Sequence, residues 1–193
     1  MKRSNSAMSE ESKKLLIPDI KRTLKTYEKD ALVSMLIDCY KMSDDVKNYV
    51  HVLLRPDEAI EDLYAKAKHT ILQEFFPQRG EGKLRLAQAK KAISKFNGLS
   101  NDESRTIDLM IYYVELGVDY INTYRDISES FYSSMESMYE NALKKINDND
   151  SYLRLYQSRL KEILYNTRGS VWGFHDCLVE SYYCYVTDEE EDD

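Results

Sequence analysis

The amino-acid sequence predicts an all-α fold of about nine helices. Apolar residues recur at spacings of three and four along nearly the whole chain, the pattern of helices that bury one face. Only 6 Gly and 3 Pro occur in 193 residues, too few for the many turns of an all-β fold. The segments between the periodic stretches are short, so consecutive helices are expected to pack as antiparallel hairpins. Either a bundle or a short tetratricopeptide-like array would satisfy this pattern.

Prolines and polar caps bound the helices of the first third of the chain. Proline is tolerated in the first turn of a helix, so a short helix is expected to begin at Pro18. A second helix covers 29–42 and has five apolar residues on one face: Leu32, Met35, Leu36, Cys39 and Tyr40. Ser43 is placed to cap a third helix, which must end before Pro56.

The remaining helices follow at regular intervals. Helices are predicted at 57–76, at 84–96 with Gly98 as the terminator, and at 103–124 behind a capping box formed by Ser100 and Glu103. The 103–124 helix is apolar around so much of its circumference that it should be the central, mostly buried one. Three more helices are expected, at 128–146, at 152–166, and from a cap at Ser170 to 186.

We therefore expect one helical domain over 17–186, preceded by a flexible segment (1–16) and followed by an acidic tail (187–193). The net charge is −7, but residues 188–193 supply six of the 34 acids. Without them the balance is 27 − 28 = −1, so the body is nearly neutral. A terminal run of like charge is typical of a solvated, disordered tail, and a role as an interaction tail is the alternative.

The cysteine pattern and the hydropathy predict a cytoplasmic protein. Cys39, Cys177 and Cys184 are odd in number and lack a CxxC pair, which argues against a disulfide framework and against a zinc site. No apolar run approaches the ~20 residues that a membrane span needs, so no membrane association is expected. No cofactor is expected either.

A basic segment at 79–95 is the first candidate site. It contains six Lys or Arg residues and one acid, Glu81, and two glycines precede a helix whose N-terminal amides attract anions. Anion or partner binding is therefore predicted at Arg79, Gly80, Gly82, Lys83 and Arg85. The alternative is that the glycines turn the chain and the lysines solvate a helix face. The spacing is not that of a P-loop, and a neutral body without a recognition motif gives no expectation of nucleic-acid binding.

A second candidate is the segment from Trp172 to Asp176, which holds the only tryptophan beside His175. Both residues are assigned to the same candidate site. The alternative is that Trp172 and Phe174 are packing anchors and His175 a hydrogen-bonded packing residue. Adjacent helical residues point about 100° apart, so His175 and Asp176 would not pair as a catalytic base and its orienting acid.

Polar residues also follow one line of the apolar 103–124 helix: Asp108, Tyr112, Glu115 and Asp119. Inward carboxylates hold di-iron centres in some bundles, but such centres need Glu-x-x-His motifs, which this chain lacks. No metal site is predicted. The line is expected to be exposed or bonded to tyrosines.

Several stretches resemble an uncharacterised family of bacterial all-helical proteins, a family of unknown function. They are 75–77, 79–80, 83–86, 90–93, 112–117, 131–138 and 172–176. The resemblance implies a cytoplasmic helical protein of bacterial origin, and it implies no activity and no site residues.

The function expected from these features is that of a non-enzymatic helical interaction or regulatory protein that binds another macromolecule, in the first place a protein. The chain contains 16 tyrosines, which suit hydrated protein interfaces because each combines an apolar ring with a polar hydroxyl. Tyr182, Tyr183 and Tyr185 are too close in sequence to face inward together. The alternative is an enzyme or a binder of small anionic ligands that joins loop 79–85 to Trp172 and His175.

Overall fold

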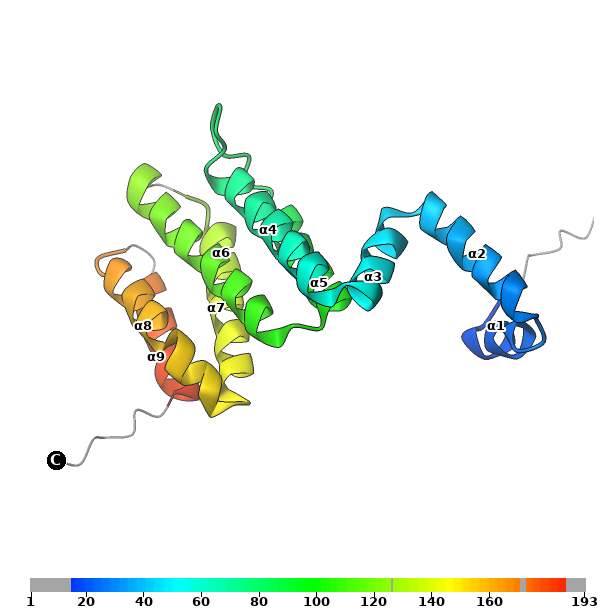
Figure 1. Ribbon diagram of the computed structural model, residues 1–193. Helices are drawn as coiled ribbons and strands as arrows, with labels where there is room; N and C mark the ends of the chain where they lie inside the picture. Colours follow the sequence, from blue (N-terminus) through cyan, green and yellow to red (C-terminus); the bar gives the residue numbers. More distant parts are fainter. Residues whose placement is uncertain (1–14, 126, 171–172, 187–193) are drawn as a thin grey trace, which may run out of the picture. The chain divides into compact units, whose positions relative to one another are not determined.

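The computed structural model describes residues 15–125, 127–170 and 173–186. Within these ranges the chain forms nine helices and no strand, which confirms the all-α prediction (Figure 1). In chain order they are α1 (Ile17–Leu24), α2 (Lys29–Met42), α3 (Asp44–Leu54), α4 (Pro56–Phe75), α5 (Leu86–Ser100), α6 (Glu103–Tyr124), α7 (Glu129–Asn147), α8 (Asp150–Asn166) and α9 (Phe174–Tyr185). The acidic tail and nearly all of the predicted N-terminal segment lie outside the described residues.

The chain divides into two compact units, the first ending at Lys47 and the second beginning at Asn48, inside α3. The second unit holds α4 to α9. Helices that are consecutive in the chain pack against each other: α4 against α5, α6 against α7, α7 against α8 and α8 against α9. A single domain over 17–186 stays a prediction.

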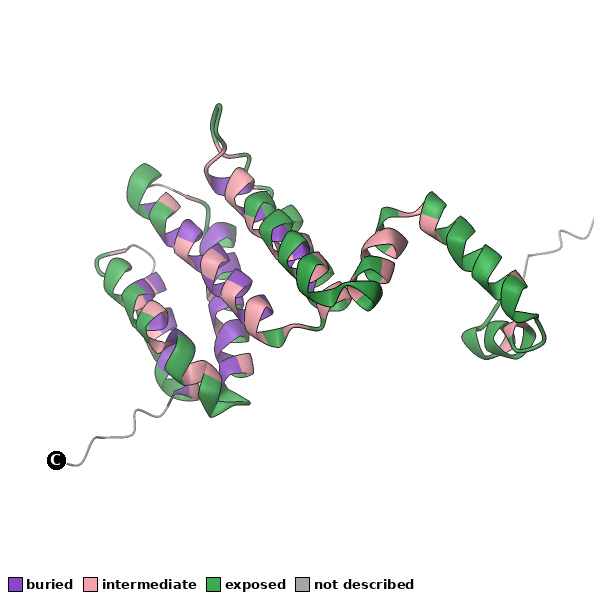
Figure 2. Ribbon diagram, in the orientation of Figure 1, coloured by how far each residue is buried: buried purple, intermediate pink, exposed green. Residues whose placement is uncertain are grey.

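Helix α6 is the centre of the second unit, as its apolar circumference predicts. It packs against α4, α5, α7 and α8 and buries half of its 22 residues (Figure 2). Ile107, Leu109 and Ile111 have no exposed surface. A helix with apolar side chains on several faces is stable only when neighbours cover all of them, and α6 is covered in this way.

The contact between α6 and α7 is close because small residues lie in it. A Cβ at Gly117 would lie 2.0 Å from Met135 Sδ, so only glycine leaves room for this fully buried methionine. One turn earlier along α6, the buried Tyr113 hydroxyl lies 2.8 Å from Ser134 Oγ. This hydrogen bond offsets the cost of burying both hydroxyls.

Helices α1 and α2 are packed very differently, because neither contains a buried residue. In α2 the polar residues Asp30, Ser34, Asp38 and Lys41 follow a single line, and most of the remaining circumference is apolar. Five of its apolar side chains are between 37% and 51% exposed: Leu32, Val33, Met35, Leu36 and Ile37. Ile17 and Ile20 in α1, and Leu16 just before it, are also exposed. These two helices therefore present apolar surface that nothing among the described residues buries.

Two helix boundaries differ from the predictions for local physical reasons. Helix α5 begins at Leu86 instead of residue 84, because the Leu84 amide donates to the Glu74 carbonyl and Leu84 takes a left-handed φ of 49°. The helix also runs through Gly98 to Ser100 and ends on Asn101, whose φ is 51°. Asparagine tolerates this left-handed conformation, so the glycine is not needed as a terminator.

Two predicted caps were wrong. Asp102 caps α6 by accepting a hydrogen bond from the Arg105 amide, whereas Ser100 donates to the Phe96 carbonyl of the preceding helix. Helix α9 begins at Phe174 and follows Gly173, whose φ is +68°, so Ser170 is not its cap. At α6 the Asp102 side chain satisfies a first-turn amide, whereas no side chain among the described residues caps α9.

Candidate functional site

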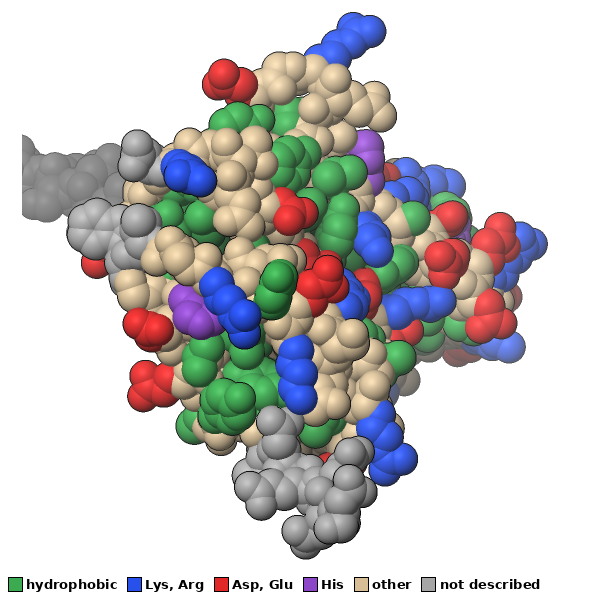
Figure 3. All heavy atoms as spheres, turned by 90° about the vertical axis from the view of Figure 1, so that its left-hand side faces the viewer, with side chains coloured by type: hydrophobic (Ala, Val, Ile, Leu, Met, Phe, Trp, Pro, Cys, Tyr) green, Lys and Arg blue, Asp and Glu red, His purple; other side chains and the backbone are tan. Residues whose placement is uncertain are grey.

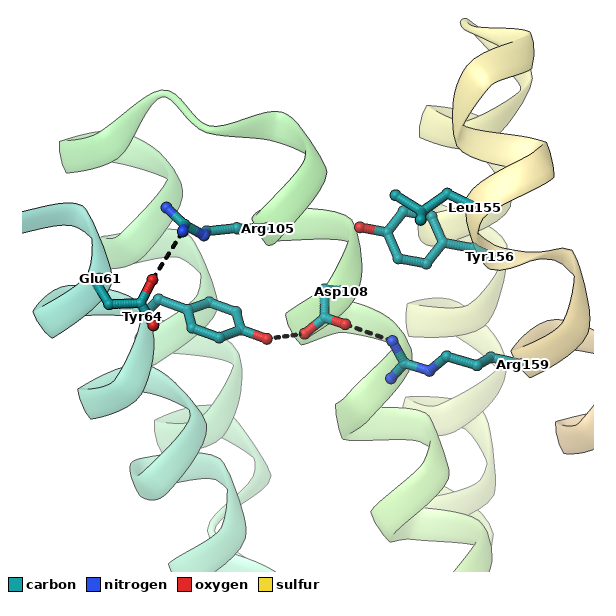
Figure 4. A pocket seen from close by; sticks show the side chains of 7 residues that line it. All are labelled: Glu61, Tyr64, Arg105, Asp108, Leu155, Tyr156 and Arg159. Atoms are coloured by element: carbon teal, nitrogen blue, oxygen red, sulfur yellow. Dashed lines mark hydrogen bonds and ion pairs between the residues drawn. The ribbon is translucent and has the colours of Figure 1, made fainter. Parts of the chain in front are cut away.

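A hollow of about 460 Å³ lies where α4, α6 and α8 meet (Figure 4). Helix α4 contributes Glu61 and Tyr64, helix α6 contributes Arg105 and Asp108, and helix α8 contributes Leu155, Tyr156 and Arg159. The three helices pack pairwise through α6, so each side chain reaches the hollow from a fixed backbone. The hollow is open to solvent on one side.

Asp108 is the hub of the polar contacts in this hollow. It accepts hydrogen bonds from the Tyr64 hydroxyl on one oxygen and from Arg159 on the other, so it joins all three helices (Figure 4). Lys68 lies 4.0 Å away on the α4 side. Burial and the bond to Asp108 raise the pKa of Tyr64, which therefore stays protonated and acts as a donor.

Arg159 connects this hollow to a second one between α6 and α8. Its Nε and Nη2 donate to the two Glu115 oxygens at 2.7 Å each, and its Nη1 donates to Asp108. Although burial alone would lower the pKa of Arg159, the two carboxylates raise it above its ordinary value. Bidentate pairs of this kind hold a guanidinium in one orientation.

The second hollow has a volume of about 200 Å³ and an acidic rim. Burial, followed by repulsion from Glu115 and Glu162, raises the pKa of Asp119. Leu116, Val118 and Ile163 form its apolar floor. A third hollow, of about 500 Å³ between α7 and α9, is lined by serines, glutamates and the exposed thiols of Cys177 and Cys184. Burial raises the pKa of Cys177, so this thiol is a poor nucleophile at neutral pH.

The chemistry of the first hollow suits recognition better than catalysis. Both Asp108 oxygens already accept from donors, so this carboxylate is not poised to take a proton from a substrate. Tyr156 is equally committed, because its hydroxyl donates to the Ser104 carbonyl at 2.7 Å. Tyrosine and arginine around an exposed leucine form the composition typical of protein-binding surfaces, and Leu155 at the rim is 59% exposed.

Arg85, at the end of the predicted basic loop, holds the loop to helix α4. Its Nε and Nη2 donate to Glu74 at 3.0 and 2.7 Å, and its backbone amide donates to the same carboxylate. Glu74 is buried, and these hydrogen bonds lower its pKa although burial opposes them. A Cβ at Gly82 would lie 2.2 Å from the Phe75 carbonyl oxygen, so this glycine allows the loop to lie against the helix end. Arg79, Gly80 and Lys83 are exposed.

The second predicted corner is only partly within the described residues, because Trp172 lies outside them. His175 is half-buried, and its Nδ1 lies 3.0 Å from the hydroxyl of the buried Thr167. Phe174 is fully buried and packs edge-on against Tyr132, as an anchor would. Loop 79–85 and His175 do not share any of the three hollows, and anion or partner binding at these residues stays a prediction.

The residues that join the helices were not among the predicted site residues. Tyr64 and Arg159 carry no sequence motif, and they reach Asp108 only because α4 and α8 both pack on α6. The one sequence feature that pointed to this site was the line of polar residues on the 103–124 helix, which includes Asp108. Its interpretation as tyrosine-bonded is confirmed for Asp108. The expectation that one of the three C-terminal tyrosines is exposed is also confirmed, since Tyr183 is 62% exposed while Tyr182 is buried.

The described residues contain neither a cluster of metal ligands nor a helix suited to span a membrane. No three side chains among their His, Cys, Asp and Glu residues are grouped so as to hold a metal ion. None of the described helices combines the length and the apolar character that crossing a bilayer requires.

Comparison with known proteins gives one match. The model of a family of unknown function, DUF6155, matches residues 15–188. No curated protein and no solved structure matches the chain.

Proposed function

Because the chain belongs to the DUF6155 family, whose description assigns no activity, we propose its function from geometry: it is a non-enzymatic protein-interaction protein that associates through α1 and α2. The partner in this interface is a second copy of the chain. One observation carries the proposal, namely that α1 and α2 are apolar over wide faces and bury no residue.

The apolar character of α2 supports a permanent partner. Between Leu32 and Ile37 the only polar residue is Ser34, which lies on the same line as Asp30, Asp38 and Lys41. Surfaces of transient partners are about as polar as the rest of a protein, whereas permanent and homodimeric interfaces are more apolar. A second copy is the permanent partner that every chain has available, and isologous dimers are the commonest oligomers.

Sedimentation velocity of the full chain over a range of concentrations tests this proposal. We expect a dimer for the wild type and a monomer for the double variant Leu32→Ser and Leu36→Ser. The matched control carries Ser34→Asn and Asp38→Asn on the polar line of the same helix, and it should remain dimeric. A wild type that is monomeric at every concentration contradicts the proposal. Near-ultraviolet circular dichroism checks that each variant keeps the packed aromatic core.

The alternative, a site for a small anionic ligand that joins loop 79–85 to Trp172 and His175, has no comparable support. Arg85 is already bound by Glu74, and His175 by Thr167. A cytoplasmic location and a bacterial origin also remain predictions, drawn from the cysteine pattern and the family resemblance.

A further inference from the structure

The part of the α4–α5 hairpin from residue 63 onward has an excess of positive charge. Between Asp62 and Asp102 the chain has eight Lys or Arg residues and only two acids, Glu74 and Glu81. Glu74 is buried and bound by Arg85, and the charge of Lys83 also lowers its pKa. Helix α5 itself contains no acid.

Most of these cations lack a carboxylate partner among the described residues. No ion pair within 4 Å is formed there by five of them: Lys66, Arg79, Lys83, Lys90 and Lys91. Lys90 is half-buried on α5, and burial lowers its pKa, which means that its charged form is poorly compensated. An approaching anion would supply that compensation.

The α6–α8 side of the same unit shows the opposite arrangement. There Arg105 pairs with Glu61, Arg159 with Asp108 and Glu115, and Lys145 with Glu103. On the side of the molecule that Figure 3 presents, acidic and basic side chains are interspersed. Cations without an ion pair among the described residues, such as Arg154, also occur outside the hairpin, but five of them gather between residues 66 and 91.

From these observations we infer that the exposed face of the α4–α5 hairpin binds an acidic segment of a partner protein. The charge complementarity comes from these five cations, because Glu81 is the only exposed acid between residues 63 and 101. The inference is independent of the proposed dimer, which uses the apolar helices α1 and α2.

The size and composition of the surface favour a peptide over a nucleic acid. Helix α5 is about 22 Å long at 1.5 Å per residue, enough for six or seven extended residues (roughly 3.3 Å each) of a partner. The first half of α4 carries Asp57, Glu58, Glu61 and Asp62, which would repel a longer polyanion that ran along the hairpin. Phe75 and Phe96 of the hairpin are buried, so they offer no platform for the stacking of bases.

Fluorescence anisotropy of a labelled octaglutamate peptide, titrated with the full chain at low salt, tests the inference. We expect saturable binding that weakens steeply as salt is added. The double variant Lys90→Glu and Lys91→Glu should weaken it at least about tenfold, because two attractive charges become repulsive ones. Because Lys90 is half-buried, a second variant with Lys83→Glu and Lys91→Glu tests the same surface through exposed residues only.

The control variant carries Arg154→Glu in α8 and Arg168→Glu just after it, two exposed positions outside both the hairpin and the proposed dimer interface, and it changes the net charge by the same amount. It should bind the peptide within about twofold of the wild type, and an equal loss would show that only net charge matters, which overturns the inference. Absence of binding to the wild type at low salt overturns it as well. A duplex DNA of similar charge is the competing probe, and tighter binding of this DNA, lost in the same hairpin variants, would replace the acidic peptide with a nucleic acid.

Discussion

Helices α2 and α6 carry similar side chains, but their surroundings differ. Both are rich in leucine, isoleucine, valine and methionine, and a line of polar residues follows one side of each. Helix α6 has four neighbours and buries eleven residues, whereas α2 buries none. The apolar area of a helix therefore shows how much of its surface must be buried. Whether it is buried depends on which other helices pack against it.

The largest expected effect is the difference in unfolding free energy between truncating an apolar side chain in α6 and truncating one in α2. Ile111→Ala in α6 removes a fully buried side chain and should lower the free energy of unfolding by about 2–5 kcal/mol. Leu36→Ala in α2 removes a side chain that is 51% exposed and should change it by less than about 0.5 kcal/mol in the monomer. Urea denaturation at a concentration below dimerisation measures both values. Similar losses for the two variants would show that α2 is buried within its own chain.

A smaller effect is expected from the same substitution at two glycines. Gly117→Ala places a methyl group against Met135 in the α6–α7 contact and should cost about 1–3 kcal/mol through overpacking. Gly98→Ala in α5 meets no atom within 4 Å and should instead stabilise the protein by about 0.5–1 kcal/mol. Thermal unfolding followed by circular dichroism gives the sign of each change. A stabilising Gly117→Ala would mean that Met135 moves aside freely and that the core around α6 is loosely packed.

An ion pair with a buried carboxylate in the second unit, Glu74 with Arg85, can be compared with an exposed one of α2, Asp38 with Lys41. Glu74→Gln replaces the buried carboxylate that accepts from three Arg85 donors with an uncharged amide that has one acceptor oxygen, and it should cost about 1–3 kcal/mol at neutral pH. Asp38→Asn in α2 removes a fully solvated partner of Lys41, at 3.7 Å, and should have no measurable effect.

The pH dependence of stability tests the same pair. The folded protein lowers the pKa of Glu74, so its stabilisation is complete above the ordinary glutamate pKa of about 4.3 and is lost as the pH falls through the lower folded value. Glu74→Gln should flatten this acid limb of the stability curve, and Asp38→Asn should leave it unchanged. An unaltered limb in Glu74→Gln would contradict the structural role of this carboxylate.

Much of the fold was predictable because it depends on local patterns. The bounds of α2 and α6 agree with the predicted 29–42 and 103–124, since each helix has a continuous apolar repeat between strong stop signals. The start of α5 was not predictable, because it depends on a hydrogen bond from the Leu84 amide to Glu74, ten residues away. The candidate site was the least predictable part, because Tyr64 and Arg159 lie 44 and 51 residues from Asp108 in sequence.

The sequence by itself determined the helices, the central place of α6 and the positive charge of the α4–α5 hairpin. Periodicity and net charge are sums over neighbouring residues, so they need no knowledge of distant contacts. Only the tertiary structure decided which charges are neutralised, as Arg159 and Arg85 are, and which remain unpaired, as Lys90 and Lys91 do. It also decided that the apolar face of α2 stays exposed, because burial depends on the neighbours that the fold brings to a helix.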